Sequence, residues 1–155
     1  MARAGVVTVS TRVSHGQSED ESGPALAELC AAAGLEVVSE VVTDDRTAIA
    51  TALKRLSDQE DMRFIFTTGG TGMTADDVTP EATRDVIERE APGYAETIRA
   101  TSREHTPLGI LTRGISGIRG RTLIVNFPGS PRAVRQSWPV VEPTLEHARD
   151  TLERS

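Results

Sequence analysis

A glycine-rich stretch followed by two adjacent carboxylates contains the residues of this chain whose types and spacing could do chemistry. The sequence Gly69-Gly70-Thr71-Gly72 is followed a few residues later by Asp76 and Asp77. Glycines lack the Cβ atom that would keep an anion away from backbone N–H groups, and carboxylates can bind a divalent cation. The stretch therefore predicts a site for a phosphate-bearing ligand, with a cation between the carboxylates and the phosphate oxygens.

The stretch does not match the common phosphate-binding motifs. It lacks the Lys-Ser/Thr ending of a P-loop and the glycine spacing of a dinucleotide-binding turn. The flanking residues nevertheless indicate its place in a fold. The apolar run at Phe64–Thr68 predicts a buried strand, and Thr79 as N-cap with Pro80 at the first helical position predicts a helix to about Glu90. The glycine turn thus follows the carboxyl end of a strand.

A second turn has the same arrangement. An apolar strand predicted at Thr122–Phe127 runs directly into Pro128-Gly129-Ser130-Pro131. Ser130 can cap a following helix, and Pro131 can occupy its first turn. Arg132 comes next, at a helix start where an anion would be held. The chain therefore has two turns suited to phosphate groups.

The remaining chain alternates strands and helices. Further strands are predicted at Ala4–Ser10 and Leu35–Val42, further helices at Ser22–Ala33, Asp45–Gln59, Tyr94–Glu104 and Pro139–Leu152, and a small hairpin or an irregular excursion around Arg113-Gly114. We expect one domain over residues 1–155, an α/β fold built as a three-layer α/β/α sandwich around a mixed, mainly parallel sheet. Because the carboxyl ends of parallel strands meet at one edge, Ser10-Thr11, the turn at Asp44 and the glycine turn should gather there.

Composition and charge argue against several classes of protein. The net charge of −6 disfavours non-specific nucleic-acid binding, and no apolar run reaches the roughly 20 residues of a membrane span. Without a signal peptide at the N-terminus, we expect a cytoplasmic protein. Cys30 lies in an apolar helical stripe, which predicts a buried structural thiol, and the scattered histidines argue against a zinc site. The run Glu19-Asp20-Glu21 is interpreted as a solvated loop that could also cover a bound ligand.

Both turns resemble the signature of the molybdopterin adenylyltransferase family, which includes the Mog and MoaB-type proteins and the G domain of gephyrin. The first match runs from Thr67-Thr68-Gly69-Gly70-Thr71-Gly72 to Asp77-Val78-Thr79-Pro80-Glu81-Ala82, and the second is Asn126-Phe127-Pro128-Gly129-Ser130-Pro131. Further matches lie at Ser22-Gly23-Pro24, Thr43-Asp44-Asp45 and Thr106–Arg113. The resemblance covers about residues 6–146 and implies the molybdopterin-binding fold.

The resemblance implies an enzyme that transfers AMP from ATP to the terminal phosphate of molybdopterin, with Mg²⁺ as cofactor and pyrophosphate as the second product. The matching positions imply that Asp44 and Asp77 are the essential acids and ligate Mg²⁺. Substrate or nucleotide binding is implied for Thr68, Gly69, Gly70, Thr71, Gly72, Thr112, Arg113, Pro128, Gly129 and Ser130. Family precedent also implies a homotrimer and a molybdenum insertase that receives the product.

Two positions depart from the family pattern, and two alternative functions stay open. Asp76 stands where many members have a basic residue, and Thr11 stands where members commonly have an acid after the serine. Asp76 either faces solvent or strengthens the metal site at a cost in nucleotide attraction. An insertase-related pterin-binding domain is one alternative, although the short chain and Gly-Gly-Thr-Gly favour adenylylation. A non-catalytic molybdopterin-binding scaffold is the other, and it would not need both Asp44 and Asp77.

Overall fold

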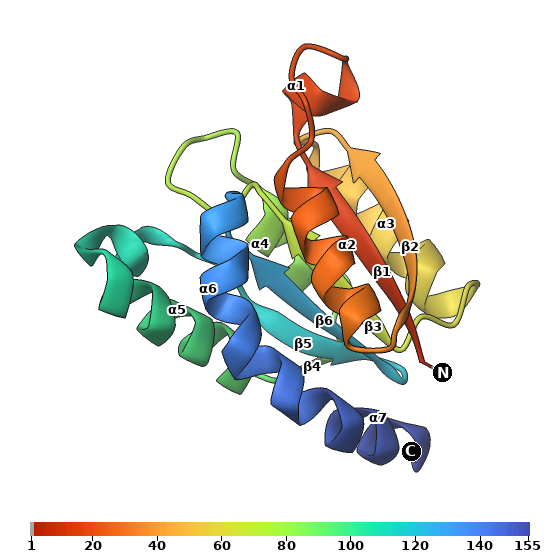
Figure 1. Ribbon diagram of the computed structural model, residues 1–155. Helices are drawn as coiled ribbons and strands as arrows, with labels where there is room; N and C mark the ends of the chain where they lie inside the picture. Colours follow the sequence, from red (N-terminus) through yellow and green to blue (C-terminus); the bar gives the residue numbers. More distant parts are fainter. Residues whose placement is uncertain (1) are drawn as a thin grey trace.

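The apolar runs predicted as strands form four neighbouring strands of a six-stranded sheet. The computed structural model describes residues 2–155 (Figure 1). The strands are β1 (Arg3–Val9), β2 (Glu36–Val42), β3 (Phe64–Thr68), β4 (Arg89–Glu90), β5 (Ser116–Arg119) and β6 (Thr122–Phe127), in the order β2-β1-β3-β6-β5-β4. The first four in that order run parallel, whereas β5 pairs antiparallel with β6 and with β4. The predicted mixed, mainly parallel sheet is confirmed.

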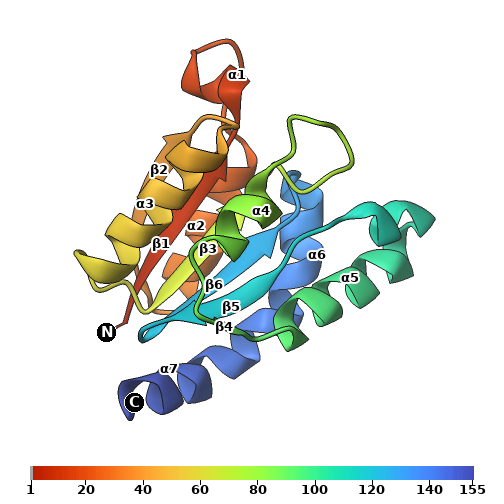
Figure 2. The same ribbon diagram turned by 180° about the vertical axis from the view of Figure 1, so that it is seen from behind.

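Helices cover both faces of the sheet, as Figures 1 and 2 show from opposite sides. One face carries α2 (Ser22–Ala32), α5 (Gly93–His105), α6 (Pro131–Val141) and α7 (Leu145–Glu153), and the other carries α3 (Arg46–Asp58) and α4 (Thr79–Arg84). Successive strand residues point to opposite faces. Val6 and Phe66 therefore enter the first core, while Val7 and Ile65 enter the second. None of the helices within residues 2–155 has the length and apolar character needed to cross a bilayer.

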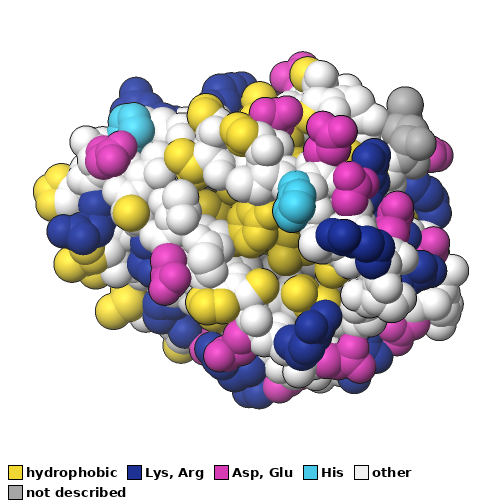
Figure 3. Space-filling view, turned by 90° about the horizontal axis from the view of Figure 1, so that it is seen from below, with side chains coloured by type: hydrophobic (Ala, Val, Ile, Leu, Met, Phe, Trp, Pro, Cys, Tyr) yellow, Lys and Arg dark blue, Asp and Glu magenta, His cyan; other side chains and the backbone are white. Residues whose placement is uncertain are grey.

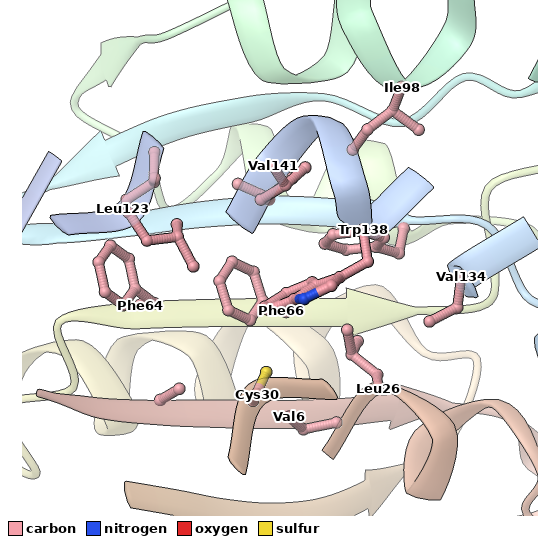
Figure 4. Packing of buried hydrophobic residues seen from close by; sticks show 14 of the residues in the cluster. Val6, Leu26, Cys30, Phe64, Phe66, Ile98, Leu123, Val134, Trp138 and Val141 are labelled. Atoms are coloured by element: carbon pink, nitrogen blue, oxygen red, sulfur yellow. The ribbon is translucent and has the colours of Figure 1, made fainter. Parts of the chain in front are cut away.

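Aromatic side chains organise the first core (Figure 4). Trp138 of α6 meets Phe66 of β3 edge to face, with ring centroids 5.6 Å apart, and Phe127 of β6 lies beside both. Cys30 of α2 is fully buried in this core. Desolvation raises the pKa of its thiol to about 12, so the thiolate is strongly disfavoured. The predicted structural role of Cys30 is confirmed.

The helix predicted to reach Glu90 ends earlier than expected. After α4 the chain turns, and Glu88 N–H donates to the carbonyl of Ile118. Arg89 and Glu90 then form the edge strand β4 against β5. These backbone groups find their partners in a segment that lies about thirty residues further on, so the local pattern could not reveal them.

The predicted closing helix is also divided. Helix α6 runs through Pro139 to Val141, and a 3₁₀ turn, η2 (Glu142–Thr144), separates it from α7. Pro143 lies in that turn and has no N–H to continue an α-helical ladder, which accounts for the break.

Of the two alternatives predicted around Arg113-Gly114, the irregular excursion is confirmed and the hairpin is wrong. Residues Pro107–Leu111 form a 3₁₀ helix, η1, and an extended segment then leads into β5. The observed hairpin joins β5 to β6 around Gly120, whose φ of +55° suits a glycine turn. A four-residue helix, α1 (Thr11–Ser14), also interrupts the loop after β1.

Candidate active site

The carboxyl ends of the four parallel strands lie along one edge of the sheet, at the top of Figure 1. The connection from β1 leads to β2 on one side, whereas β3 lies on the other side of β1. This reversal of strand order opens a crevice between the ends of β1 and β3, the place where doubly wound sheets bind ligands. The glycine turn follows β3, and the second turn follows β6, its neighbour.

A cavity of about 270 Å³ lies at this crevice. Its walls are the end of β1, the loop at residues 18–22, Thr68 with Gly69 after β3, and Gly129 with Pro131 after β6. Residues that are about 60 positions apart in the sequence thus line one space. Of the residues predicted to bind substrate or nucleotide, Thr68, Gly69 and Gly129 border the cavity directly.

The opposite edge of the sheet has a hollow of a different character. A space of about 310 Å³ lies there, and its floor includes the apolar residues Leu35, Phe64 and Leu145. Figure 3 views the molecule from this side and shows apolar side chains gathered in the hollow. Because none of the predicted site residues lines it, we place the candidate active site at the carboxyl edge.

Close packing of the two turns explains why glycines occupy them. A Cβ at Gly69 would lie 2.4 Å from the Val9 carbonyl oxygen, and the φ of Gly69 is +100°. A Cβ at Gly129 would lie 3.1 Å from the Cα of Gly69. At Gly69, glycine is therefore required both by the conformation and by the space beside β1. At Gly129, a side chain would press on the backbone of the first turn.

Threonine hydroxyls fix the backbone of the glycine turn. Thr68 Oγ1 donates to the Pro128 carbonyl at 2.7 Å and so joins the first turn to the second. Thr79 Oγ1 donates to the Gly69 carbonyl at 2.9 Å. The prediction that Thr79 caps α4 is wrong, because Val78 occupies the cap position and the hydroxyl is used to hold the turn. Pro80 lies in the first turn of α4, but at its second position and not at the first position that was predicted.

Asp77 lies in the irregular loop between the glycine turn and α4. Its Oδ2 accepts hydrogen bonds from the N–H and the hydroxyl of Thr74, at 3.0 and 2.9 Å. Its Oδ1 accepts none from the residues that the structure describes. The neighbouring Asp76 is exposed, which agrees with the interpretation that its carboxylate faces solvent.

Asp44 follows β2 and contacts the loop after β1. Its Oδ2 accepts from the N–H and the hydroxyl of Thr11, at 2.9 and 3.0 Å, while its own N–H donates to Thr11 Oγ1 at 3.0 Å. Thr11 stands where family members commonly have an acid, and here it is an uncharged donor of two hydrogen bonds to the Asp44 carboxylate. A second carboxylate at this position would repel it.

Asp44 and Asp77 lie at the same edge of the sheet. The strands that precede them, β2 and β3, flank β1. Two strand spacings place the ends of these strands ~10 Å apart. Within residues 2–155 no group of three or more His, Cys, Asp or Glu side chains could hold a metal ion. Any ion at this edge would therefore take most of its ligands from bound substrate and water.

Arg113 contacts the chain rather than the cavity. Nε donates to the Gly72 carbonyl at 2.7 Å, Nη2 donates to the Asp77 carbonyl at 2.7 Å, and Nη1 donates to the Glu81 carboxylate at 2.8 Å. The hydrogen bond from Arg113 to Glu81 lowers the pKa of the Glu81 carboxyl group and so favours its ionised form. The neighbouring Thr112 hydroxyl contacts that of Thr71 at 3.3 Å.

The sequence interpretation missed Asp20. This half-buried residue lines the cavity, and its carboxylate accepts from the Thr8 hydroxyl at 2.8 Å and from the Gly23 N–H at 3.0 Å. It was grouped with two adjacent acids in a loop that was interpreted as solvated and able to cover a bound ligand; the structure half-buries its side chain against the start of α2. The sequence contained a signal for this contact, because an acid three residues before a helical N–H has the spacing of an N-terminal cap.

Ser130 caps α6 as predicted, and its hydroxyl accepts from Ala133 N–H at 3.1 Å.

Known proteins share this sequence over nearly its whole length. The family described as "Probable molybdopterin binding domain" matches residues 5–147. The molybdopterin adenylyltransferase of Helicobacter pylori strain J99 is 38% identical over 151 residues, covering 96% of this chain and 86% of that protein. The molybdenum cofactor synthesis protein cinnamon of Drosophila melanogaster is 40% identical over 146 residues, covering 93% of this chain. The chain spans only 24% of the length of cinnamon.

Solved structures share the fold as well. The crystal structure of the molybdopterin biosynthesis enzyme MoaB from Thermus thermophilus matches with a TM-score of 0.93 and 41% identity, covering 100% of this chain and 98% of that chain. The family match includes both glycine turns and the turn at Asp44, which the fold brings to one edge of the sheet. This chain therefore belongs to the molybdopterin-binding domain family.

Proposed function

We propose that this protein is a molybdopterin adenylyltransferase, which transfers AMP from ATP to the terminal phosphate of molybdopterin in molybdenum cofactor biosynthesis. The observation that carries the proposal is that Gly69 and Gly129, from the two turns, line one shared cavity at the edge of the sheet that also bears Asp44 and Asp77. Relatives that are named molybdopterin adenylyltransferase match 96% of this chain, which supports the same function.

The proposed reaction requires little covalent chemistry from the protein. A phosphate oxygen of molybdopterin forms a bond to the α-phosphorus of ATP as the bond from that phosphorus to pyrophosphate breaks. Both reactants are polyanions, so the enzyme's task is to align them and offset their repulsion. Backbone N–H groups of residues 69–72 would receive nucleotide phosphates. The N-terminus of α6, where Ser130 is the cap, would receive a further phosphate group, with Pro128 and Gly129 shaping the turn.

Asp44 and Asp77 are the proposed Mg²⁺ ligands. In each carboxylate Oδ2 accepts hydrogen bonds from a threonine, whereas Oδ1 accepts none from residues 2–155. Mg²⁺ is commonly bound by one or two carboxylates together with waters and substrate phosphates, so these donors fit the ion. When bound, Mg²⁺ would neutralise the facing phosphates and the charge that develops on pyrophosphate. Thr112 would border the pterin and nucleotide pockets, and Arg113 would act through the loop that it contacts.

The direct test combines the purified protein with molybdopterin, ATP and Mg²⁺ and measures pyrophosphate and adenylylated molybdopterin. We expect both products in equal amounts, and neither product when EDTA removes the metal. Molybdopterin binding without pyrophosphate release would refute the enzymatic function and support the scaffold alternative. Product formation that is unaffected by EDTA would refute the metal assignment alone.

The cellular setting is proposed from the family resemblance. We infer that the protein acts in the cytoplasm as a homotrimer and passes its product to a molybdenum insertase. Light scattering tests the trimer, because a monomer of 16.6 kDa is easily distinguished from an assembly of three. A monomeric mass at assay concentration would contradict it.

A further inference from the structure

The loop that carries Asp77 has few connections to the rest of the protein. Residues 71–78 contain neither helix nor strand, and among the residues that the structure describes the Asp77 carboxylate accepts hydrogen bonds only from Thr74, within the same loop. In the part of the chain that the structure describes, Arg113 supplies all but one of the hydrogen bonds between residues 71–77 and other segments. The exception is the contact between the hydroxyls of Thr112 and Thr71, at 3.3 Å. The position of this loop therefore depends on Arg113.

Arg113 holds the loop at both ends. Its backbone N–H donates to the Thr71 carbonyl at 2.8 Å, and its Nε donates to the Gly72 carbonyl at 2.7 Å. At the far end Nη2 donates to the carbonyl of Asp77 itself at 2.7 Å. A planar guanidinium fixes several acceptors in one geometry, which a lysine cannot do. Movement of Arg113 would therefore move the backbone of Asp77.

Two further side chains orient Arg113. Glu81, in the first turn of α4, accepts from Nη1 at 2.8 Å and from Nη2 at 3.2 Å. Arg99 of α5 donates through Nη1 to the carbonyls on either side of Arg113, at 2.8 Å to Gly114 and 3.3 Å to Thr112. Helices from opposite faces of the sheet thus hold Arg113 between them.

We propose that Glu81 and Arg99 are positioning residues for the adenylyl transfer, which act through Arg113 to fix the loop of Asp77. The inference rests on the proposed function of Asp77. The Glu81 carboxylate binds Arg113, and Arg99 binds the carbonyls beside it, so we expect both to act through Arg113 and not through contact with substrate. A misplacement of about 1 Å at a reacting group can cost on the order of 100-fold in rate, whereas an exposed ion pair contributes little to stability. Replacing Glu81 or Arg99 should therefore lower the turnover rate more strongly than it lowers the free energy of unfolding.

Helix α4 offers a matched control. Asp85, at its other end, accepts two hydrogen bonds from Arg46, at 2.7 and 2.8 Å. This pair is also a partly exposed arginine–carboxylate fork, and among the described residues its side chains form no hydrogen bond with residues 71–78. Glu81→Gln and Asp85→Asn therefore remove the same kind of charge from the two ends of α4, and only Glu81→Gln removes a hydrogen-bond partner of Arg113.

The experiment measures kcat, KM and backbone hydrogen exchange in both variants. We expect Glu81→Gln to lower kcat about 10-fold with little change in KM, and to speed exchange in residues 71–79. Arg99→Gln should give the same pattern, whereas Asp85→Asn should change neither quantity. Glu81→Asp, which restores the charge, should recover part of kcat.

Two results would overturn the inference. Unchanged exchange in residues 71–79 would show that Glu81 does not position the loop. Faster exchange with unchanged kcat would show that the loop position does not matter for the reaction. Asp77→Asn, measured alongside, separates the two proposals: if it also retains full turnover, then the proposed role of Asp77 has failed as well.

Discussion

Replacement of Gly69 by alanine tests the close approach of the glycine turn to the end of β1 most directly. Gly69 has a φ of +100°, and a Cβ there would lie 2.4 Å from the Val9 carbonyl oxygen. A left-handed conformation costs an alanine about 1–2 kcal/mol, and the clash with backbone adds about 1–3 kcal/mol as overpacking. We therefore expect Gly69→Ala to lower the free energy of unfolding by about 2–5 kcal/mol, which most domains survive.

Gly34→Ala is the control for the conformational part of this cost. Gly34 follows α2 with a φ of +86°, and a Cβ there would meet nothing within 4 Å. Urea denaturation should show a loss of about 1–2 kcal/mol for this variant, with unchanged turnover. For Gly69→Ala we also expect turnover to fall by at least about 10-fold, because Val9 and Gly69 border the cavity and must move apart. Equal destabilisation of the two variants would refute the claim that crowding against the Val9 backbone requires glycine at position 69.

Four further outcomes are expected. Asp77→Asn should lower turnover on the order of 100-fold with molybdopterin affinity retained, because its proposed role is electrostatic; an unchanged rate would remove the metal role. Asn126→Asp should destabilise the fold by at least ~3 kcal/mol in urea titration, because a charge would replace a buried amide that donates to two threonine hydroxyls. Cys30, with its thiol pKa raised to about 12, should react with a thiol reagent at pH 8 only in denaturant. Hydrogen bonds from Arg113 lower the pKa of Glu81 below its ordinary 4.5, so the stability that the pair contributes is present above that pH and lost as pH falls through the lowered pKa. The stability difference between wild type and Glu81→Gln should therefore shrink between pH 6 and pH 3.

Short-range patterns predicted the centre of the fold well. The strands at Phe64–Thr68 and Thr122–Phe127 have the bounds that the apolar runs indicated. Both runs end at a glycine- or proline-rich turn, and such residues act on the backbone locally. The cap at Ser130 was likewise predictable, because the hydroxyl and the N–H that it accepts from lie three residues apart.

Segments whose hydrogen bonds come from distant parts of the chain were predicted poorly. Arg89 and Glu90 were predicted to end a helix, yet they form an edge strand because β5 lies beside them. Thr79 was predicted to cap a helix, yet its hydroxyl donates a hydrogen bond to the carbonyl of Gly69. In both cases a partner outside the local window competes successfully with the local preference.

The sequence by itself determined the family, the two glycine turns and the identity of the acids at Asp44 and Asp77. Only the tertiary structure decided what surrounds them. Arg113, whose predicted role is to bind substrate, donates to carbonyls 36 and 41 residues away in the chain. A residue's type limits the bonds that it can make, but the partner it finds depends on which segments the packing of sheet and helices brings within hydrogen-bond distance.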